Sequence, residues 1–282
     1  MNGRAAAYLQ LLRPLNCVMM GLAVWIGQFL ASSWHPNPMK MTLSFVTAFT
    51  LTGMSMVVND LYDIEVDRRN APHRPLPSGM VERREAITMA LLLGTVGLAS
   101  SAVTSPICLF IAGLFAAIAT AYSARGKQAG LIGNVLVSLS VAVPFLYGGA
   151  VEAETAETLL LYFFAMAFFS CLGREITKGI ADVEGDPLRG VRSLALTYGK
   201  NVAARAAGIC YLLAVAITPA PYASGLVGPP YLALAAAADV GFVAVVALLL
   251  RDPEPENARR LKRIALYVML VGLAAFFAGG LH

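Results

Sequence analysis

The stretch Asn59-Asp60-Leu61-Tyr62-Asp63-Ile64-Glu65-Val66-Asp67 directly follows a long apolar segment, Met41–Val58, that contains no charged residue. Acidic side chains at the end of an apolar segment of membrane length are costly, so each of them needs a partner or a function. Three cations follow at once, Arg68, Arg69 and Arg74. This junction is therefore predicted to be the point where a membrane-spanning helix meets a charged site.

The spacing of three oxygen-bearing residues in this stretch indicates a metal site. Asn59, Asp63 and Asp67 are four residues apart, and a helix that turns about 100° per residue places all three on one face. Three oxygen ligands in a row suit a hard divalent cation. The alternative for this stretch alone is a solvated helix cap with charge pairs.

The composition indicates a membrane protein. Hydrophobic residues make up 58% of the 282 residues and charged residues only 13%, which is far from the composition of a soluble domain. The four cysteines lie singly in apolar segments and show no CxxC spacing: Cys17, Cys108, Cys171 and Cys210. Neither a zinc site nor a disulfide framework is therefore indicated.

Several apolar runs have the length of a membrane span, roughly 17–25 residues. They are Leu15–Ala31, Met41–Val58, Ala86–Thr104, Pro106–Tyr122, Leu131–Val151, Thr158–Ile180, Val202–Pro219, Tyr231–Leu250 and Ile264–Leu281. The sequence therefore predicts an all-α membrane protein with nine transmembrane helices in a single bundle around a central cavity. No long linker or low-complexity segment interrupts the chain, so residues 1–282 are predicted to form one domain.

The basic residues predict the orientation of these spans. All of the 21 Lys and Arg residues except Lys40 fall on the side of the N-terminal arm and of the loops after the even-numbered spans. The positive-inside rule places this side in the cytoplasm. We therefore expect a multi-pass protein of the cell membrane, with a cytoplasmic N-terminus and an active site on the cytoplasmic side.

A second polar ladder follows the sixth span. Its residues are again spaced by four, so a continuing helix would carry them on one face: Arg174, Lys178, Asp182 and Asp186. Its pattern GxxDxxxD matches the DxxDxxxD of the first ladder, with Gly179 in place of Asp60. An internal duplication of a helix pair would explain the match and would let the two ladders meet across the bundle.

Two further polar features lie outside the ladders. The end of the fourth span carries Tyr122-Ser123-Ala124-Arg125-Gly126-Lys127 on the cytoplasmic side. Asp239 lies within the eighth span, where an unpaired carboxylate is costly. It has either a functional role or a structural hydrogen bond to a neighbouring helix.

Two carboxylate pairs surrounded by Arg and Lys suit a diphosphate that is held by magnesium. Mg²⁺ usually binds one or two carboxylates plus substrate phosphates, and two such ions neutralise a diphosphate as its bond breaks. Arg adds a bidentate fork and Lys a point charge. A soluble nucleotide would not need nine spans around its site. The predicted substrate is therefore a lipid diphosphate, with its head at the cytoplasmic rim and its tail between helices.

These motifs resemble those of the UbiA superfamily of intramembrane prenyltransferases. The first acidic motif of that superfamily, NDxxDxxxD, matches residues 59–67, and the following segment reads Arg74-Pro75-Leu76-Pro77-Ser78-Gly79. The second, DxxxD, matches residues 182–186, and a YSxxxK element matches residues 122–127. The resemblance covers nearly the whole chain. Relatives often carry Lys-Asp before the second motif where this chain has Lys178-Gly179. The second site of this chain therefore has one carboxylate fewer than that of those relatives.

The resemblance implies a reaction and a set of site residues. The superfamily binds a prenyl diphosphate through two Mg²⁺ ions, ionises it toward an allylic cation and joins the prenyl group to an acceptor. The residues that would hold metal are Asn59, Asp63, Asp67, Asp182 and Asp186, and the four aspartates among them would be catalytic. The residues that would bind the substrates are Arg13, Asn16, Asp60, Arg68, Arg74, Tyr122, Arg125, Lys127, Arg174 and Lys178.

Three segments bear on the acceptor, namely residues 11–19, 130–149 and 174–178. They resemble the archaeal digeranylgeranylglyceryl phosphate synthases more than the 4-hydroxybenzoate branch. The resemblance implies transfer of a geranylgeranyl group to geranylgeranylglyceryl phosphate, which forms the second ether bond of archaeal membrane lipids. The phosphate of that acceptor would use further basic residues, such as Arg13, Arg125 or Arg174. These residues could instead anchor the protein to anionic lipid headgroups.

Three other functions stay open. Prenylation of an aromatic acceptor such as 4-hydroxybenzoate would belong to quinone biosynthesis. An ion-coupled transporter would place its carboxylates near the membrane midplane, where only Asp239 fits. A CDP-alcohol phosphotransferase would carry DGxxAR…GxxxDxxxD, and nothing here matches its first half. The expected partners are a prenyl diphosphate, a lipid-like acceptor and membrane lipids, with no nucleic acid and no protein partner indicated.

Overall fold

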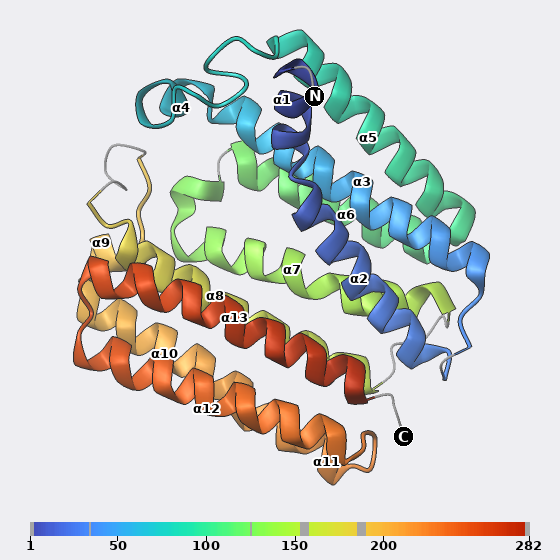
Figure 1. Ribbon diagram of the computed structural model, residues 1–282, viewed down its shortest axis with the longest axis vertical. Helices are drawn as coiled ribbons and strands as arrows, with labels where there is room; N and C mark the ends of the chain where they lie inside the picture. The colour runs from blue at the N-terminus through green and yellow to red at the C-terminus, as the bar shows by residue number, and fades with distance from the viewer. Residues whose placement is uncertain (1–2, 34, 125, 153–157, 185–189, 280–282) are drawn as a thin grey trace. The chain divides into compact units, whose positions relative to one another are not determined.

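The computed structural model describes residues 3–33, 35–124, 126–152, 158–184 and 190–279. These residues form helices and the turns that join them, with no β-strand among them (Figure 1). The helices are α1 (Gly3–Leu12), α2 (Pro14–Ala31), α3 (Pro38–Tyr62), α4 (Ile64–Asn70), α5 (Arg83–Thr104), α6 (Pro106–Ala124), the 3₁₀ turn η1 (Gly126–Ala129), α7 (Leu131–Glu152), α8 (Thr158–Ala181), α9 (Leu194–Tyr198), α10 (Lys200–Ile217), α11 (Pro219–Ala223), α12 (Pro229–Arg251) and α13 (Pro255–Gly279).

Within the described part of the chain, nine helical segments are long and apolar enough to cross a membrane. Each of them overlaps one of the predicted spans, from the segment Gly3–Ala31 to the segment Pro255–Gly279. The all-α membrane fold predicted from the lengths of the apolar runs is therefore confirmed. The central cavity and the cytoplasmic N-terminus stay predictions.

Proline and capping side chains mark where several of the helices start. Proline occupies the first turn of α2, α3 and α12. The N–H groups of a first turn have no partner within the helix, so the N–H that proline lacks is not needed there. The side-chain oxygen of Asn37 caps α3 by accepting from the backbone N–H groups of Met39 (2.9 Å) and Lys40 (3.2 Å). Glu82 and Glu85 form a capping box at the start of α5. Both helices therefore begin before the apolar runs that predicted them.

A break in the helix lies just before the first predicted span, Leu15–Ala31. Arg13 lies between α1 and α2 with φ 51° and ψ 64°, a left-handed conformation that is uncommon for residues other than glycine. A right-handed helix cannot continue through this conformation. The helical segment Gly3–Ala31 is therefore two helices joined at Arg13, and the predicted span lies within the second of them.

The first of two compact units comprises residues 1–125 and 147–155. In this unit α3 packs against α1, α2, α5 and α6. Small residues allow the helices to approach closely. Gly148 of α7, for example, lies against the α2 backbone at Val24 and Gln28.

A buried polar network joins three helices of the first unit. The amide of Gln28 in α2 donates to Glu152 of α7 (2.9 Å) and accepts from the hydroxyl of Ser44 in α3 (2.5 Å). The ammonium group of Lys40 donates to the carbonyl of Val151 (2.8 Å). Because Gln28 is fully buried, these partners offset the cost of placing an amide inside a membrane-spanning segment.

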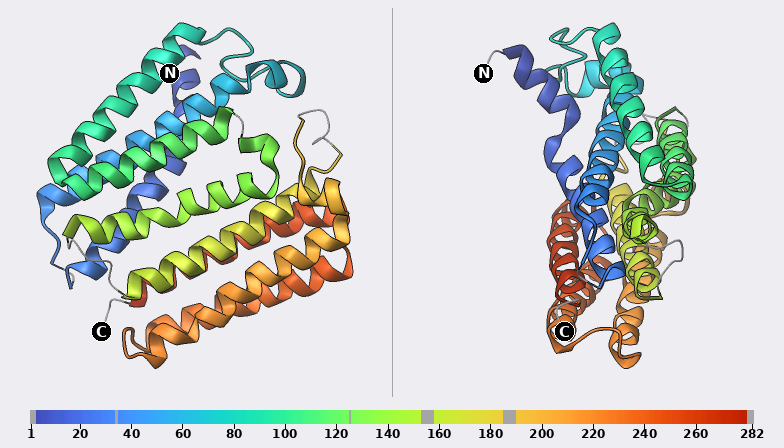
Figure 2. Two further views of the ribbon diagram at one scale, coloured as in Figure 1. Left: turned by 180° about the vertical axis from the view of Figure 1, so that it is seen from behind. Right: turned by 90° about the vertical axis from the view of Figure 1, so that its right-hand side faces the viewer.

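The second unit comprises residues 126–146 and 156–282. In this unit α8 packs against α10 and α13, while α12 packs against α10 and α13. Figure 2 shows these four long helices side by side. Gly173 of α8 lies against the ring of Tyr211 in α10. α8, which leads into the second acidic motif, is therefore held by two long helices of its own unit. That residues 1–282 form one domain stays a prediction.

Asp239 of α12 has a structural partner in the second unit. The hydroxyl of Thr218 donates to Asp239 Oδ1 (3.0 Å), and the hydroxyl of Tyr231 donates to the carbonyl of Thr218 (2.9 Å). The carboxylate thus meets a hydrogen-bond donor at the junction of α10 and α11. This contact agrees with the structural alternative for Asp239 rather than with an ion path.

Candidate active site

The first acidic motif lies at the end of α3 and in the short helix α4. Asp63 stands between the two helices, yet the helical backbone bonds continue. The Asp63 N–H donates to the carbonyl of Asn59 (3.1 Å), and the Asp67 N–H donates to that of Asp63 (2.8 Å). The Asn59 amide also donates to Asp63 Oδ2 (3.1 Å). The structure therefore brings together the first two metal ligands that the spacing predicted.

The third carboxylate of this ladder is paired with Arg74. Arg74 Nη1 donates to Asp67 Oδ2 (2.6 Å), and the Asp67 side chain is only 11% exposed. Partial burial lowers the pKa of Arg74, but the hydrogen bond and charge of Asp67, together with the charges of Asp60 and Asp63, outweigh burial and raise this pKa. Arg74 is thus held as a cation beside the carboxylates of the motif.

The loop that carries Arg74 is anchored to the core of the first unit. Leu76 and Val81 are buried against α1, α3 and α5. The Val81 N–H donates to the carbonyl of Pro75 (3.1 Å), and the Ser78 N–H donates to that of Arg74 (3.0 Å). The position of the Arg74 guanidinium therefore follows from apolar anchors on its C-terminal side and from backbone turns, not only from its ion pair.

Asp60 is engaged by the residue at the break between α1 and α2. Arg13 Nη2 donates to Asp60 Oδ1 (2.6 Å), and the Asp60 side chain is 7% exposed. Arg13 Nη1 and Asn16 Nδ2 also approach the sulfur of Met56, at 3.6 Å and 4.0 Å. Because sulfur is a weak acceptor, Asp60 is the stronger partner. Arg13 and Asp60, both predicted to bind substrate, are therefore each other's partners in this structure.

The remaining predicted residues in this part of the chain are Arg68, Tyr122, Arg125 and Lys127. Arg68 pairs with Glu65 (2.8 Å), and both side chains are well exposed. Tyr122 is half-buried near the end of α6. Arg125 and the side chain of Lys127 lie outside the described residues.

The second acidic motif begins where α8 ends. The helix stops at Ala181, so the continuous helix that was expected through Asp182 and Asp186 is not observed. Asp182 lies in a turn, and its N–H still donates to the carbonyl of Lys178 (3.0 Å). Asp186 lies outside the described residues. The four-residue ladder is therefore described only from Arg174 to Asp182.

α13 supplies two cations to the end of α8. Lys262 Nζ approaches Asp182 Oδ1 at 3.4 Å, and Arg259 Nε donates to the carbonyl of Ala181 (3.3 Å). Positive groups at a helix C-terminus complement its dipole. Neither cation was predicted as a site residue. Their three-residue spacing in a basic segment, which places both on one helix face, is the sequence signal that could have identified them.

The two cations before Asp182 share one carboxylate, that of Glu175. Arg174 Nη1 donates to Glu175 Oε1 (3.1 Å), and Lys178 Nζ donates to Glu175 Oε2 (3.0 Å). The Glu175 side chain is 7% exposed. Sequence reasoning assigned Arg174 and Lys178 to the substrate but missed Glu175, although its i,i+3 spacing to Lys178 was a usable signal.

Close packing gives a physical reason for the missing carboxylate at position 179. A Cβ atom on Gly179 would lie 3.3 Å from the Cβ of Ser193. The Ser193 side chain caps α9 by accepting from the N–H of Leu196 (3.4 Å). A longer acidic side chain at this position would have to fit against that cap. The asymmetry between the two motifs therefore coincides with tight packing at the end of α8.

The model of the UbiA prenyltransferase family matches residues 20–278 of the chain. The chain belongs to this family. It is therefore a multi-pass membrane protein of a prenyltransferase family, as the motifs and the apolar spans predicted.

Several UbiA relatives are similar over nearly their whole length. The digeranylgeranylglyceryl phosphate synthase of Methanopyrus kandleri is 39% identical over 272 residues, which cover 96% of this chain and 98% of the relative. That of Archaeoglobus fulgidus is 37% identical over 275 residues, with 95% and 93% covered. A solved structure described as digeranylgeranylglyceryl phosphate synthase in membranes is 33% identical, covers 98% of both chains and has a TM-score of 0.86.

The UbiA fold also extends to more distant solved structures. A UbiA homologue from Archaeoglobus fulgidus bound to DMAPP and Mg²⁺ is 19% identical and covers 95% of this chain and 98% of that chain, with a TM-score of 0.74. At this identity the similarity concerns the fold alone.

The donor chemistry of the first UbiA motif fits Mg²⁺. Among the described residues no three His, Cys, Asp or Glu side chains converge as a metal cluster. Mg²⁺ nevertheless needs only one or two carboxylates when substrate phosphates complete its shell. Asp63 and the neighbouring Asn59 lie within hydrogen-bond distance, and rotation of the Asn59 amide would present a second oxygen. These two residues, with Asp67 one turn further on, are a suitable ligand set.

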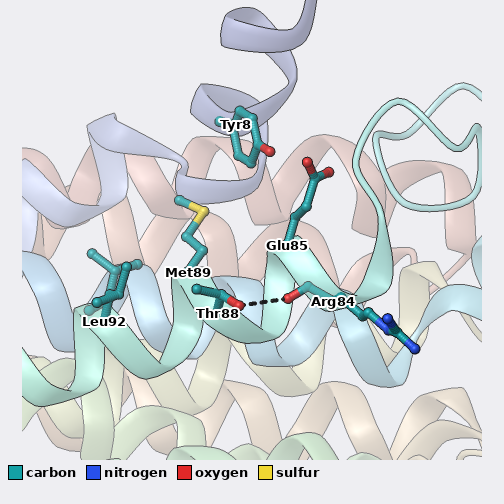
Figure 3. A pocket seen from close by; sticks show the side chains of 7 residues that line it. Tyr8, Arg84, Glu85, Thr88, Met89 and Leu92 are labelled. Carbon is teal, nitrogen blue, oxygen red and sulfur yellow. Dashed lines mark hydrogen bonds between the residues drawn. The ribbon is translucent and has the colours of Figure 1, made fainter.

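A groove in the first unit lies outside the predicted site. It has a volume of about 560 Å³ and is lined by residues of α1 and α5: Tyr8, Arg84, Glu85, Thr88, Met89, Leu92 and Leu93. Figure 3 shows the apolar side chains of Met89 and Leu92 along one part of it and the polar groups of Tyr8, Glu85 and Arg84 along the other. None of its lining residues belongs to the two UbiA motifs.

Proposed function

We propose that the chain transfers a geranylgeranyl group from geranylgeranyl diphosphate to geranylgeranylglyceryl phosphate, in a Mg²⁺-dependent reaction. The product would contain the second ether bond of archaeal membrane lipids. The observation that carries this proposal is the similarity to named digeranylgeranylglyceryl phosphate synthases, which reaches 39% identity and covers almost the full length of both chains. The carboxylates and cations of the candidate site supply the chemistry that this reaction needs.

In this proposal the metal ligands come from both acidic motifs. Asn59, Asp63 and Asp67 would hold one Mg²⁺ at the end of α3, and Asp182 and Asp186 would hold a second after α8. Magnesium, when bound, neutralises negative charge on the departing diphosphate. The solved UbiA homologue bound to DMAPP and Mg²⁺ supports this cofactor and this class of donor substrate.

The basic residues would stabilise the leaving group. Negative charge builds on the diphosphate as its bond to the prenyl carbon breaks, so fixed cations bind the transition state more strongly than the substrate. Arg74 is suited to this role because its loop is anchored and because Asp67 orients it. Lys127, Arg174 and Lys178 are proposed as further diphosphate ligands.

The acceptor would use residues near the first helix break. Arg13 is 35% exposed although it is paired with Asp60, so part of its guanidinium can meet a phosphate at the membrane surface. Asn16, Tyr122, Arg125 and Arg68 are proposed as further contacts to the two substrates.

We also propose that this chemistry takes place on the cytoplasmic face of the cell membrane. The proposal rests on the distribution of the basic residues, of which only Lys40 falls on the opposite side. Both substrates are lipids, so their tails would occupy the apolar interior while their charged heads stay at the cytoplasmic rim.

A panel of acceptors tests the proposed function. Purified protein in detergent would receive geranylgeranyl diphosphate, Mg²⁺ and either geranylgeranylglyceryl phosphate or 4-hydroxybenzoate. We expect the first acceptor to be prenylated at a rate at least about tenfold above the second, since its phosphate adds charge-assisted contacts. Turnover of 4-hydroxybenzoate alone would move the function to quinone biosynthesis. Ion flux in proteoliposomes without prenyl transfer would favour a transporter.

A further inference from the structure

Glu175 is a buried carboxylate that binds two cations from its own helix. It lies in the last two turns of α8, with a side chain that is 7% exposed. Its two oxygens accept from different partners, Oε1 from Arg174 (3.1 Å) and Oε2 from Lys178 (3.0 Å). The neighbouring turns of α8 carry buried apolar side chains, such as those of Leu172 and Ile176.

Helix stability alone gives little reason for a carboxylate at this position. The helix dipole acts mainly within the last turn, so it has little effect at Glu175, and an i,i+3 pair such as that with Lys178 adds only a small amount of helix stability. Burial of an ion pair also costs solvation free energy that an apolar side chain would not lose. An apolar residue at position 175 would match Leu172 and Ile176 at lower cost. The carboxylate is therefore better explained by what it does to its two partners.

The cluster of Arg174, Glu175 and Lys178 contains two cations and one anion. Lys178 is one turn before Asp182, the first residue of the second acidic motif. Arg174 Nε is buried and has no hydrogen-bond partner among the described residues. A guanidinium has five N–H donors. After the bond from Nη1 to Glu175, Arg174 therefore keeps N–H groups that could donate hydrogen bonds to an anion.

We propose that Glu175 is a positioning residue, which holds Arg174 and Lys178 in the orientation that binds a phosphate group of a substrate. This inference rests on the proposed function. Arg and Lys side chains lose much rotational freedom when they are ordered. A carboxylate that orders them before the substrate arrives lowers the entropic cost of binding. Each oxygen of Glu175 already accepts from a cation, which suits positioning rather than proton transfer.

The phosphate could belong to either substrate. The prenyl donor carries a diphosphate and the proposed acceptor carries a phosphate, and both offer the same oxygen acceptors to Arg174 and Lys178. The KM values for the two substrates distinguish these sources, because a disordered pair of cations weakens only the substrate that it contacts.

Two substitutions of Glu175 and one matched control test the proposal. Glu175→Gln keeps the shape but removes the charge, and Glu175→Asp keeps the charge on a shorter side chain. The control is Glu254→Gln, which removes another carboxylate bound to a lysine, Lys200 (2.6 Å), at an exposed position. Purified variants would be compared by kcat, by KM for each substrate, and by the rise in Tm that inorganic diphosphate with Mg²⁺ produces.

We expect Glu175→Gln to raise KM for one of the two substrates about tenfold, as loss of a supporting partner does at other sites, with a smaller change in kcat. Glu175→Asp should lie between this variant and the wild type, and Glu254→Gln should match the wild type. If the diphosphate is the bound group, its stabilising effect on Tm should also shrink in Glu175→Gln.

Wild-type KM values for both substrates in Glu175→Gln, together with an unchanged diphosphate-induced shift in Tm, would overturn the positioning role. Failure of the proposed function has a different signature, the absence of transfer to geranylgeranylglyceryl phosphate by the wild type. The shift in Tm that inorganic diphosphate with Mg²⁺ produces needs no turnover, so it would then still decide the role of Glu175.

Discussion

At the scale of single residues, the acidic side chains of the first motif have different partners. Asp60 and Asp67 are nearly buried and each is bound to an arginine at 2.6 Å. Asp63 accepts from the amide of Asn59 (3.1 Å), the neighbouring predicted ligand of the same motif. Because these two predicted ligands already lie together, Asp63 is the carboxylate from which the metal site of the first motif is best tested.

Asp63→Ala should abolish most Mg²⁺-dependent transfer while the protein stays folded in detergent. Loss of a ligand that holds charge at the leaving group should lower kcat/KM at least about 100-fold, as removal of other transition-state contacts does. The measurement is the steady-state rate with geranylgeranyl diphosphate, combined with size-exclusion chromatography. The control is Glu65→Ala on α4, because Glu65 is 80% exposed and its ion pair among the described residues is with the exposed Arg68. Wild-type kcat/KM in Asp63→Ala would exclude this residue as a metal ligand.

The pair of Arg13 and Asp60 should be coupled in stability. Arg13→Ala leaves the Asp60 carboxylate buried without its cation, so it should lower the free energy of unfolding by about 1–2 kcal/mol. Asp60→Asn should reduce that loss when it is combined with Arg13→Ala, because the unpaired charge is gone. Denaturant titration of the two single variants and the double variant in micelles measures the coupling. Strictly additive losses would show that the 2.6 Å contact contributes no net stability.

At the scale of helices, apolar length predicted the spans but not every helix end. The candidate spans follow from run length because a helix satisfies its own backbone groups in lipid. The short helix α1 before the first predicted span, and the break at Arg13 that separates the two, depend on one left-handed residue, which hydropathy does not indicate. The end of α8 at Ala181 was not predicted either. Residues spaced by four fit one face of a helix, but this spacing does not show where the helix ends. A ladder of residues spaced by four from Arg174 does not include Glu175, so that spacing does not predict the pairing of Glu175 with Arg174 and Lys178.

The crossing of α7 and α2 depends on the absence of a side chain at Gly148. A Cβ at this position would collide with the backbone of α2 at Val24 and Gln28. Gly148→Ala should therefore force the helices apart and lower the free energy of unfolding by about 1–3 kcal/mol. Gly113→Ala on α6 is the control, since no neighbouring atom lies within 4 Å of its added Cβ and alanine favours helix. Equal stability of the two variants would contradict a close crossing at Gly148.

At the scale of the whole molecule, the motifs predicted the family and the reaction class, and both acidic motifs lie at the ends of long helices as expected. The sequence could reach this far because metal ligands and phosphate-binding cations are few in an apolar chain, so their spacing is conspicuous. It could not reveal which cation binds which carboxylate. The contacts of Asp67 with Arg74 and of Asp182 with Lys262 join residues that only folding brings together.

The most direct test of the account is product formation by the purified protein with and without metal. Geranylgeranyl diphosphate and geranylgeranylglyceryl phosphate would be supplied with excess Mg²⁺ or with EDTA, and the products would be identified by mass spectrometry. We expect digeranylgeranylglyceryl phosphate with Mg²⁺, and a rate at least about 100-fold lower with EDTA that recovers when Mg²⁺ is restored. Absence of this product with Mg²⁺, or an equal rate in EDTA, would contradict the account.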